Sequence, residues 1–132
     1  MASNEFTVHD VTDFPVVRMR RVWPGYASQW KTEMDLLVEK ASPFVVIFDD
    51  SAPMEIHEDR KVRGLWLKKN KAVLGRVCRA VIAVEADPAT RAVMQAQAQA
   101  LAVGQAFGVA MVIASSVPEA EEKAQALLYG GA

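Results

Sequence analysis

Residues 58–79 read EDRKVRGLWLKKNKAVLGRVCR, and the interpretation of the whole chain starts from this stretch. It holds eight of the 15 Lys and Arg residues, and after Asp59 it contains no acidic residue. On a helix of about 3.6 residues per turn, its apolar side chains share one arc and four cations gather opposite. The apolar arc consists of Val62, Trp66, Leu67, Val73, Leu74, Val77 and Cys78, and the cations are Lys61, Lys68, Lys71 and Arg79. The pattern predicts one amphipathic helix with a basic outer face.

The length and composition are typical of one folded domain. The chain has 132 residues, of which 52% are hydrophobic and 23% are charged. A chain of this length buries about two-thirds of its unfolded surface, so we expect residues 1–132 to form a single domain without a metal or a disulfide. The net charge is −1, but all 16 acidic residues and only seven of the basic residues lie outside residues 60–79. Charge is therefore segregated along the chain.

The N-terminal sequence, the lengths of the apolar segments and the cysteine content indicate the cellular compartment. The N-terminus has neither the basic start nor the apolar run of a secretory signal, and no apolar segment approaches the roughly 20 residues of a membrane span. Cys78 is the only cysteine, and its place on the apolar arc predicts a buried thiol, compatible with a reducing environment. We therefore expect a cytoplasmic protein without a membrane span.

Strand and helix patterns alternate along the rest of the chain. Apolar alternation on both sides of the turn at residues 12–15 predicts a β-hairpin, and three continuous apolar runs predict buried strands. Asp87 before Pro88, and Ser116 with Glu119, are typical helix starts. The expected strands are 6–11, 16–22, 44–48, 80–84 and 109–114, and the expected helices are 26–41, 58–79, 88–107 and 116–128.

This order of elements predicts an α/β fold. It predicts a single mixed, mainly parallel five-stranded sheet and four helices, and the elements follow one another along the chain in the order ββαβαβαβα. Successive strand–helix–strand units imply parallel pairing, right-handed crossovers and helices on both faces of the sheet. The first strand should lie antiparallel to the second at one edge.

The opening hairpin, the four helices and the apolar strand that ends in Asp49-Asp50-Ser51 resemble the STAS superfamily. The chain is most similar to small stand-alone bacterial proteins related to the anti-sigma-factor antagonist of sporulation, whose fold is also compared with Sec14-type lipid-binding domains. The resemblance covers nearly the whole chain. It rests on the order of the strands and helices and not on a short diagnostic motif. It implies a regulatory serine at the start of the helix that follows this strand. Glu58 or Asp59 occupies that position here, either as a mimic of phosphoserine or as an acid suited to a helix's first turn.

An acidic loop follows the central strand, at the edge of the sheet where α/β proteins usually bind ligands. It consists of Asp49, Asp50, Glu55, His57, Glu58 and Asp59. Carboxylates suit a hard cation, but the spacing matches no standard calcium loop, so we expect a solvated loop, no metal and no cofactor.

No catalytic constellation is assembled in the sequence. Ser51, His57 and Asp49 are the residue types of a hydrolase triad, but the glycine-flanked nucleophile elbow is missing. Cys78 should pack rather than react. We therefore expect a protein that is not an enzyme and has no catalytic residues.

The basic face is the candidate partner surface. Lys61, Lys68, Lys71 and Arg79 could bind an acidic protein, nucleic acid or an anionic membrane surface, or could simply be solvated. Nucleic acid is disfavoured because Trp66 lies on the apolar side. Arg63 falls within the apolar arc, so we expect it to pair with Asp49 or Asp50, or to lie at the rim of an interface or pocket.

These observations lead to a ranked set of functions. The leading hypothesis is a non-catalytic, cytosolic regulatory or scaffolding domain that contacts a protein partner through the basic helix and the acidic loop. The first alternative is a domain that binds a lipid or small metabolite between the helices and the sheet. Binding of nucleic acid or an anionic surface through residues 60–79 is the second alternative. An enzyme at the acidic loop would require a cleft that holds His57, and a homodimer remains open.

Overall fold

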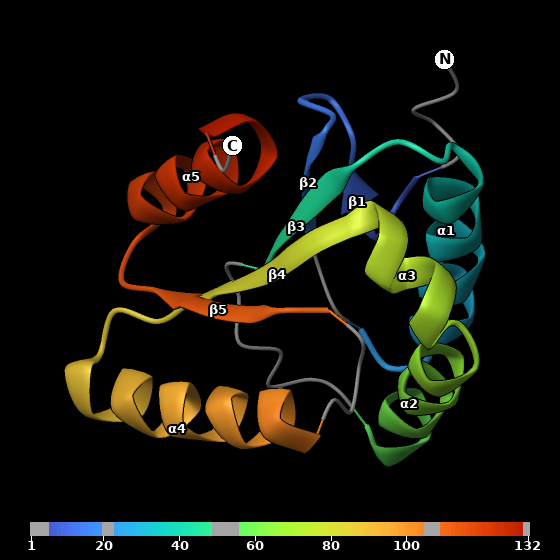
Figure 1. Ribbon diagram of the computed structural model, residues 1–132. Coiled ribbons are helices and arrows are strands. Elements are labelled where there is room, and N and C mark those ends of the chain that lie inside the picture. The colour runs from blue at the N-terminus through green and yellow to red at the C-terminus, as the bar shows by residue number, and fades with distance from the viewer. Residues whose placement is uncertain (1–5, 20–22, 49–55, 105–108, 131–132) are drawn as a thin grey trace.

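The computed structural model describes residues 6–19, 23–48, 56–104 and 109–130 (Figure 1). The strands are β1 (His9–Asp10), β2 (Val16–Met19), β3 (Phe44–Phe48), β4 (Cys78–Val84) and β5 (Met111–Ala114). The helices are α1 (Ala27–Glu39), α2 (His57–Lys69), α3 (Lys71–Val77), α4 (Pro88–Gly104) and α5 (Val117–Gln125), and a π-helical turn, η2 (Ala126–Gly130), continues α5. None of the helices in this part of the chain is both long and apolar enough to cross a membrane.

The five strands form one sheet in the order β1-β2-β3-β4-β5. β1 pairs with β2 in an antiparallel hairpin, and the other neighbours are parallel. The α/β class and the mixed, mainly parallel five-stranded sheet are confirmed. The first strand is shorter than the expected 6–11, because the N–H groups of residues 7–9 donate to the Glu33 carboxylate of α1.

Helices cover both faces of the sheet, as expected. Because side chains alternate along a strand, Val17, Val46 and Val81 share one face in register, and Val16, Val45 and Ala80 share the other. Helices α1 to α4 lie on the first face, and α5 with η2 lies on the second (Figure 1). The second face packs tightly against small side chains of α5, Ala120 and Ala124.

The basic stretch is not one helix, which corrects the sequence prediction. Helix α2 ends at Lys69, α3 begins at Lys71, and β4 begins at Cys78. At the junction, Asn70 has φ −105° and ψ 15°, and its side-chain Nδ2 donates to Trp66 O at 3.0 Å. Asparagine competes for backbone hydrogen bonds in this way and so interrupts helices. The described residues therefore contain five helices rather than four.

The last helix begins as predicted. Ser116 Oγ accepts a hydrogen bond from Glu119 N at 3.2 Å, which satisfies one of the free N–H groups of α5. The Glu119 carboxylate accepts from Ser115 Oγ at 3.0 Å and from Ser115 N, one residue earlier than in a standard capping box.

Candidate ligand-binding site

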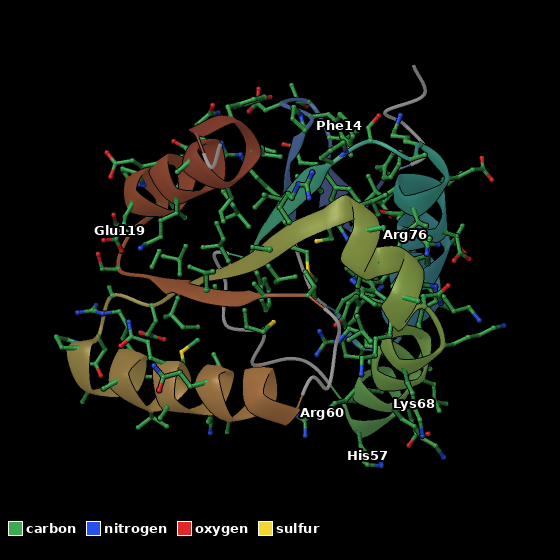
Figure 2. The ribbon with its side chains drawn as sticks, in the orientation of Figure 1. Phe14, His57, Arg60, Lys68, Arg76 and Glu119 are labelled. Atoms are coloured by element: carbon green, nitrogen blue, oxygen red, sulfur yellow. The ribbon has the colours of Figure 1, made fainter. Side chains whose placement is uncertain are left out.

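The structure describes three residues of the predicted acidic loop, His57, Glu58 and Asp59. Asp49, Asp50 and Glu55 lie outside the described residues. His57 and Glu58 are exposed at the start of α2, and Figure 2 shows His57 directed away from the sheet. Within the described ranges, no three His, Cys, Asp or Glu side chains are grouped to hold a metal ion.

Asp59, the third described residue of the acidic loop, is a buried capping residue. Its side chain is 4% exposed. One carboxylate oxygen accepts from Gly25 N at 2.8 Å, and the other accepts from Ala27 N, the first residue of α1, at 3.2 Å. Gly25 has φ +90°, a left-handed conformation that glycine adopts without strain. Asp59 therefore ties the start of α2 to the start of α1, because the free N–H groups of a helix start need acceptors.

The predicted basic face is divided among three elements. Lys61 and Lys68 are exposed on α2, and Figure 2 shows Lys68 on the outer side of that helix. Lys71 is half-buried in α3, and Arg79 is exposed on β4. The four cations thus do not form one continuous helical stripe, because the chain changes direction at Asn70 and again at Cys78.

An apolar cavity of about 370 Å³ lies between the first face of the sheet and helices α1, α2 and α4. Its apolar wall includes Met19, Trp30, Met34, Val46, Phe48, Leu67, Val81, Met94 and Met111. The edge-on contact of Trp30 with Trp66, at 5.4 Å between ring centroids, fixes one side of this wall. The polar groups at the cavity come from His9, Arg60 and Arg63.

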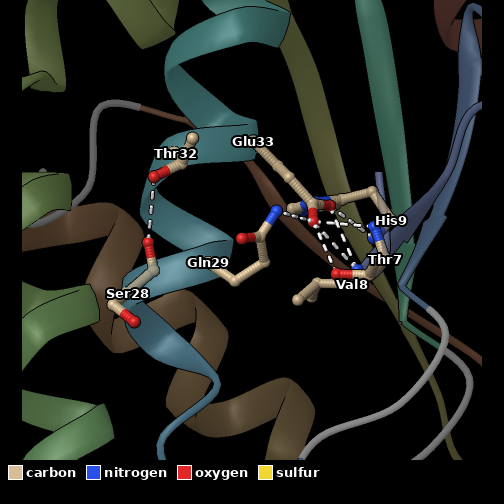
Figure 3. A network of polar contacts seen from close by, with 7 residues as sticks. All are labelled: Thr7, Val8, His9, Ser28, Gln29, Thr32 and Glu33. Atoms are coloured by element: carbon tan, nitrogen blue, oxygen red, sulfur yellow. Dashed lines mark hydrogen bonds and ion pairs between the residues drawn. The ribbon is translucent and has the colours of Figure 1, made fainter. Parts of the chain in front are cut away.

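A buried carboxylate orients His9 (Figure 3). Glu33, on α1, and His9 are both 0% exposed. Glu33 Oε1 accepts from His9 Nδ1 at 2.9 Å and from His9 N at 2.8 Å. Its Oε2 accepts from Thr7 N at 2.8 Å and from Gln29 Nε2 at 2.8 Å, and Val8 N lies 3.1 Å from both oxygens. The carboxylate is saturated with donors.

These donors keep Glu33 ionised. Burial alone raises the pKa of Glu33, but the hydrogen bonds from His9, Thr7, Val8 and Gln29 outweigh it and lower the pKa from 4.5 to about 2. An ionised carboxylate only accepts hydrogen bonds, so His9 Nδ1 is the donor to Glu33 Oε1. His9 Nε2 is buried, and no described residue is hydrogen-bonded to it. His9 is among the residues that line the cavity.

Helix α2 brings two cations to the same cavity. Arg63 is half-buried and Arg60 is exposed, and Figure 2 shows Arg60 on the side of α2 that faces α4. The expected pairing of Arg63 with Asp49 or Asp50 falls outside the described residues. The alternative drawn from the sequence, a place at the rim of a pocket, agrees with the position of Arg63.

Cys78 is a packing residue, as expected. Its side chain is 3% exposed and its thiol donates to Ala80 O at 3.4 Å. Burial raises the pKa of the Cys78 thiol from 9.0 to about 12, so at neutral pH it is protonated and a poor nucleophile.

The sequence analysis missed His9 and Glu33. A signal for Glu33 was present, because it stands three residues after Trp30 and four before Leu37, both on the buried side of α1. A carboxylate at a helix position that is otherwise apolar indicates a buried partner. The partner itself, 24 residues away in the chain, had no local signal.

Comparisons with protein-family models, curated proteins and solved structures found no match to this chain.

Proposed function

We propose that the protein binds a small, largely apolar molecule in the cavity between the sheet and helices α1, α2 and α4. The observation that carries this proposal is an apolar cavity of about 370 Å³ with polar groups from only a few residues. Ligand sites commonly have volumes of about 300–1,000 Å³ and combine an apolar wall with a few polar groups. The cavity fits both criteria.

The composition of the wall supports the same function. Four methionines, Met19, Met34, Met94 and Met111, contribute to it. Methionine side chains are flexible and polarisable, so they adapt to ligands of different shape. Larger side chains at these positions would fill the space and stabilise the fold, since residual cavities cost about 24 cal/mol per Å³. A retained cavity with an adaptable wall is suited to binding.

The proposal is tested with a neutral dye, N-phenyl-1-naphthylamine, whose emission rises in apolar surroundings. We expect saturable binding to the wild-type protein. Ala83 lies on the cavity floor in register with Phe48 and Ile113, so Ala83→Leu should occupy the space and weaken dye binding by about tenfold or more, equivalent to about 1.4 kcal/mol. The control is Ala72→Leu, the same substitution at an exposed position of α3. Absence of dye binding, or equal binding by Ala83→Leu, would show that the cavity is not a binding site.

A regulatory or scaffolding contact with a protein partner is the second candidate function. Leu65 is 61% exposed on α2, and Lys61, Lys68 and Lys69 are exposed on the same helix. An exposed large apolar side chain among cations suits a docking contact with an acidic protein surface. Membership of the STAS superfamily stays a proposal as well, supported by the opening hairpin and the mixed sheet with helices on both faces.

The second function is tested by affinity capture from lysate of the native host. We expect the double variant Lys61→Glu/Lys68→Glu to lose partners that the wild type captures. Arg79→Glu is the matched control, because Arg79 is exposed on β4 rather than on α2. Capture of the same proteins by the wild type and the double variant would exclude α2 as the contact surface.

A further inference from the structure

Two arginines and a glycine of α2 line the apolar cavity, and the proposed function does not explain them. We propose that the cavity selects molecules with an apolar body and a carboxylate at one end. The body enters past Gly64, and Arg60 and Arg63 bind the carboxylate at the mouth of the cavity. This inference rests on the proposed function, because it names the chemical class of the ligand for the same cavity.

A ligand contacts only the part of the cavity wall that solvent also reaches. Trp30 and Met34 are each 4% exposed, so they support the wall from behind. The reachable apolar surface is formed by side chains that are half-buried and come from the sheet, α2 and α4. They are Phe48, Leu67, Val81, Ala83, Met94 and Met111. The body of the ligand therefore lies against an apolar surface.

The fixed charges at this cavity have one sign. Arg60 is exposed and Arg63 is half-buried, and none of the described lining residues is acidic. A guanidinium group stays protonated, and its planar set of N–H donors matches the two oxygens of a carboxylate. With five donors, it can hold a carboxylate beside the contacts that it makes within the protein. An anionic end group therefore complements the cavity better than a neutral one.

The spacing along α2 orients such a ligand. Arg60, Arg63, Gly64 and Leu67 stand at helical spacing, so they share one face of α2, and all four line the cavity. Figure 2 shows Arg60 on the side of α2 that faces α4. A carboxylate is costly to bury without partners, so it stays where Arg60 is exposed. The apolar body then extends toward Leu67 and the sheet.

Gly64 is the observation that a solvated pair of arginines does not explain. It lies in the middle of α2, where glycine is a poor helix residue. A Cβ atom at this position would meet no atom of the described chain within 4 Å, so no packing contact there requires a glycine. Gly64 is also exposed at the cavity. The missing side chain leaves room for a ligand to approach the helix backbone.

Two probes that differ in charge test the role of the arginines: 2-naphthoate and 2-naphthamide. They share one ring system and have end groups of nearly the same shape, but only the first is an anion at neutral pH. Affinities are measured by isothermal titration calorimetry with wild type, Arg60→Gln and Arg63→Gln. The matched control is Arg76→Gln, because Arg76 is exposed on α3 and does not line the cavity.

We expect wild type to bind 2-naphthoate about tenfold more tightly than 2-naphthamide, the usual size of one charge-assisted hydrogen bond. This ratio should fall toward equality in Arg60→Gln and in Arg63→Gln and should stay unchanged in Arg76→Gln. Equal affinities of wild type for the two probes, or a ratio that neither glutamine variant lowers, would overturn the inference while the cavity still binds. Failure of both probes to bind would overturn the proposed function as well.

Gly64→Leu tests the path of the ligand. The substitution adds a side chain where the described chain leaves open space, and leucine is a better helix former than glycine. We expect a thermal unfolding midpoint equal to or above that of wild type, together with at least about tenfold weaker binding of both probes. Unchanged affinity, or a lower midpoint together with weaker binding, would overturn the assignment of Gly64 to the ligand.

A measurement on the wild-type protein covers the case in which Arg63→Gln does not fold. The ratio of naphthoate to naphthamide affinity should fall as sodium chloride is added, because salt screens an ionic contact at an exposed mouth. The apolar contribution is common to both probes and cancels in the ratio. A ratio that does not change with salt would contradict binding of the carboxylate by the arginines.

Discussion

At the scale of single residues, Glu33 has the most demanding environment in the described chain. It is fully buried on α1 and accepts hydrogen bonds from Thr7, Val8, His9 and Gln29. A buried carboxylate is tolerated only when such donors compensate for lost hydration. The same hydrogen bonds hold residues 7–9 against α1 and orient the ring of His9. Glu33 therefore contributes both to stability and to the candidate site.

Glu33 also makes stability depend on pH. Its pKa falls from 4.5 to about 2 in the folded protein, so its contribution is present above pH 4.5 and is lost as pH falls toward 2. By linkage this contribution is roughly 3 kcal/mol. We expect urea unfolding to show that Glu33→Gln is less stable than wild type at pH 7 and that the difference shrinks toward pH 2. Glu39→Gln, an exposed position on α1, is the control, and a difference that is constant with pH would contradict the prediction.

Cys78 provides a second prediction at this scale. Because its thiol is buried and its pKa is raised to about 12, we expect a thiol reagent such as 5,5′-dithiobis(2-nitrobenzoic acid) to label the native protein very slowly at neutral pH. Unfolding in urea should restore the rate of an ordinary cysteine. Fast labelling of the native protein would show that the thiol is accessible and that β4 does not bury it.

At the scale of elements, contacts between helix ends matter more than the charge pattern of any one helix. Asp59 belongs to the first turn of α2, yet its carboxylate caps α1 through Gly25 and Ala27. Tyr26, the residue at the start of α1, makes no side-chain cap of its own. Asp59 therefore links the first turn of α2 to the start of α1.

The cap on α1 distinguishes a structural role for Asp59 from a surface role. Asp59→Ala should lower the free energy of unfolding by about 1–2 kcal/mol, the usual cost of a lost helix cap. The adjacent Glu58→Ala should change it by less than about 0.5 kcal/mol, because Glu58 is exposed. Both are measured by urea unfolding. Equal effects of the two substitutions would mean that Asp59 does not cap α1.

At the scale of the whole molecule, the two faces of the sheet differ in packing. On the face under α5, Ala80 belongs to a buried cluster with Ala114, Ala120 and Ala124, and the face under α1, α2 and α4 contains the apolar cavity. Strand β4 contributes to both, because its side chains alternate. Ala80 is fully buried on the α5 face, and Ala83 lines the cavity on the other.

The same substitution on these two faces should therefore have opposite consequences. Ala80→Leu overfills a packed core and should cost about 1–3 kcal/mol. Ala83→Leu enters existing space, so thermal unfolding should show a stability equal to or above that of the wild type. If Ala83→Leu proved as destabilising as Ala80→Leu, the space above β4 would already be filled.

The apolar periodicities of this sequence determined its α/β class, the hairpin at the sheet edge and the parallel strands, because alternation and helical spacing record burial within a short stretch. They also placed Arg63 at an unusual, partly buried position. Local pattern could not show the end of the basic helix at Asn70, since the apolar arc continues across it into α3 and β4.

Tertiary structure alone decided the candidate site. The bond from His9 to Glu33 joins residues 24 positions apart, and the cap from Asp59 to Gly25 joins residues 34 positions apart. The cavity depends on how helices α1 to α4 pack against one face of the sheet. Such contacts depend on the relative placement of distant elements, and the spacing of residues within one element carries no record of that placement.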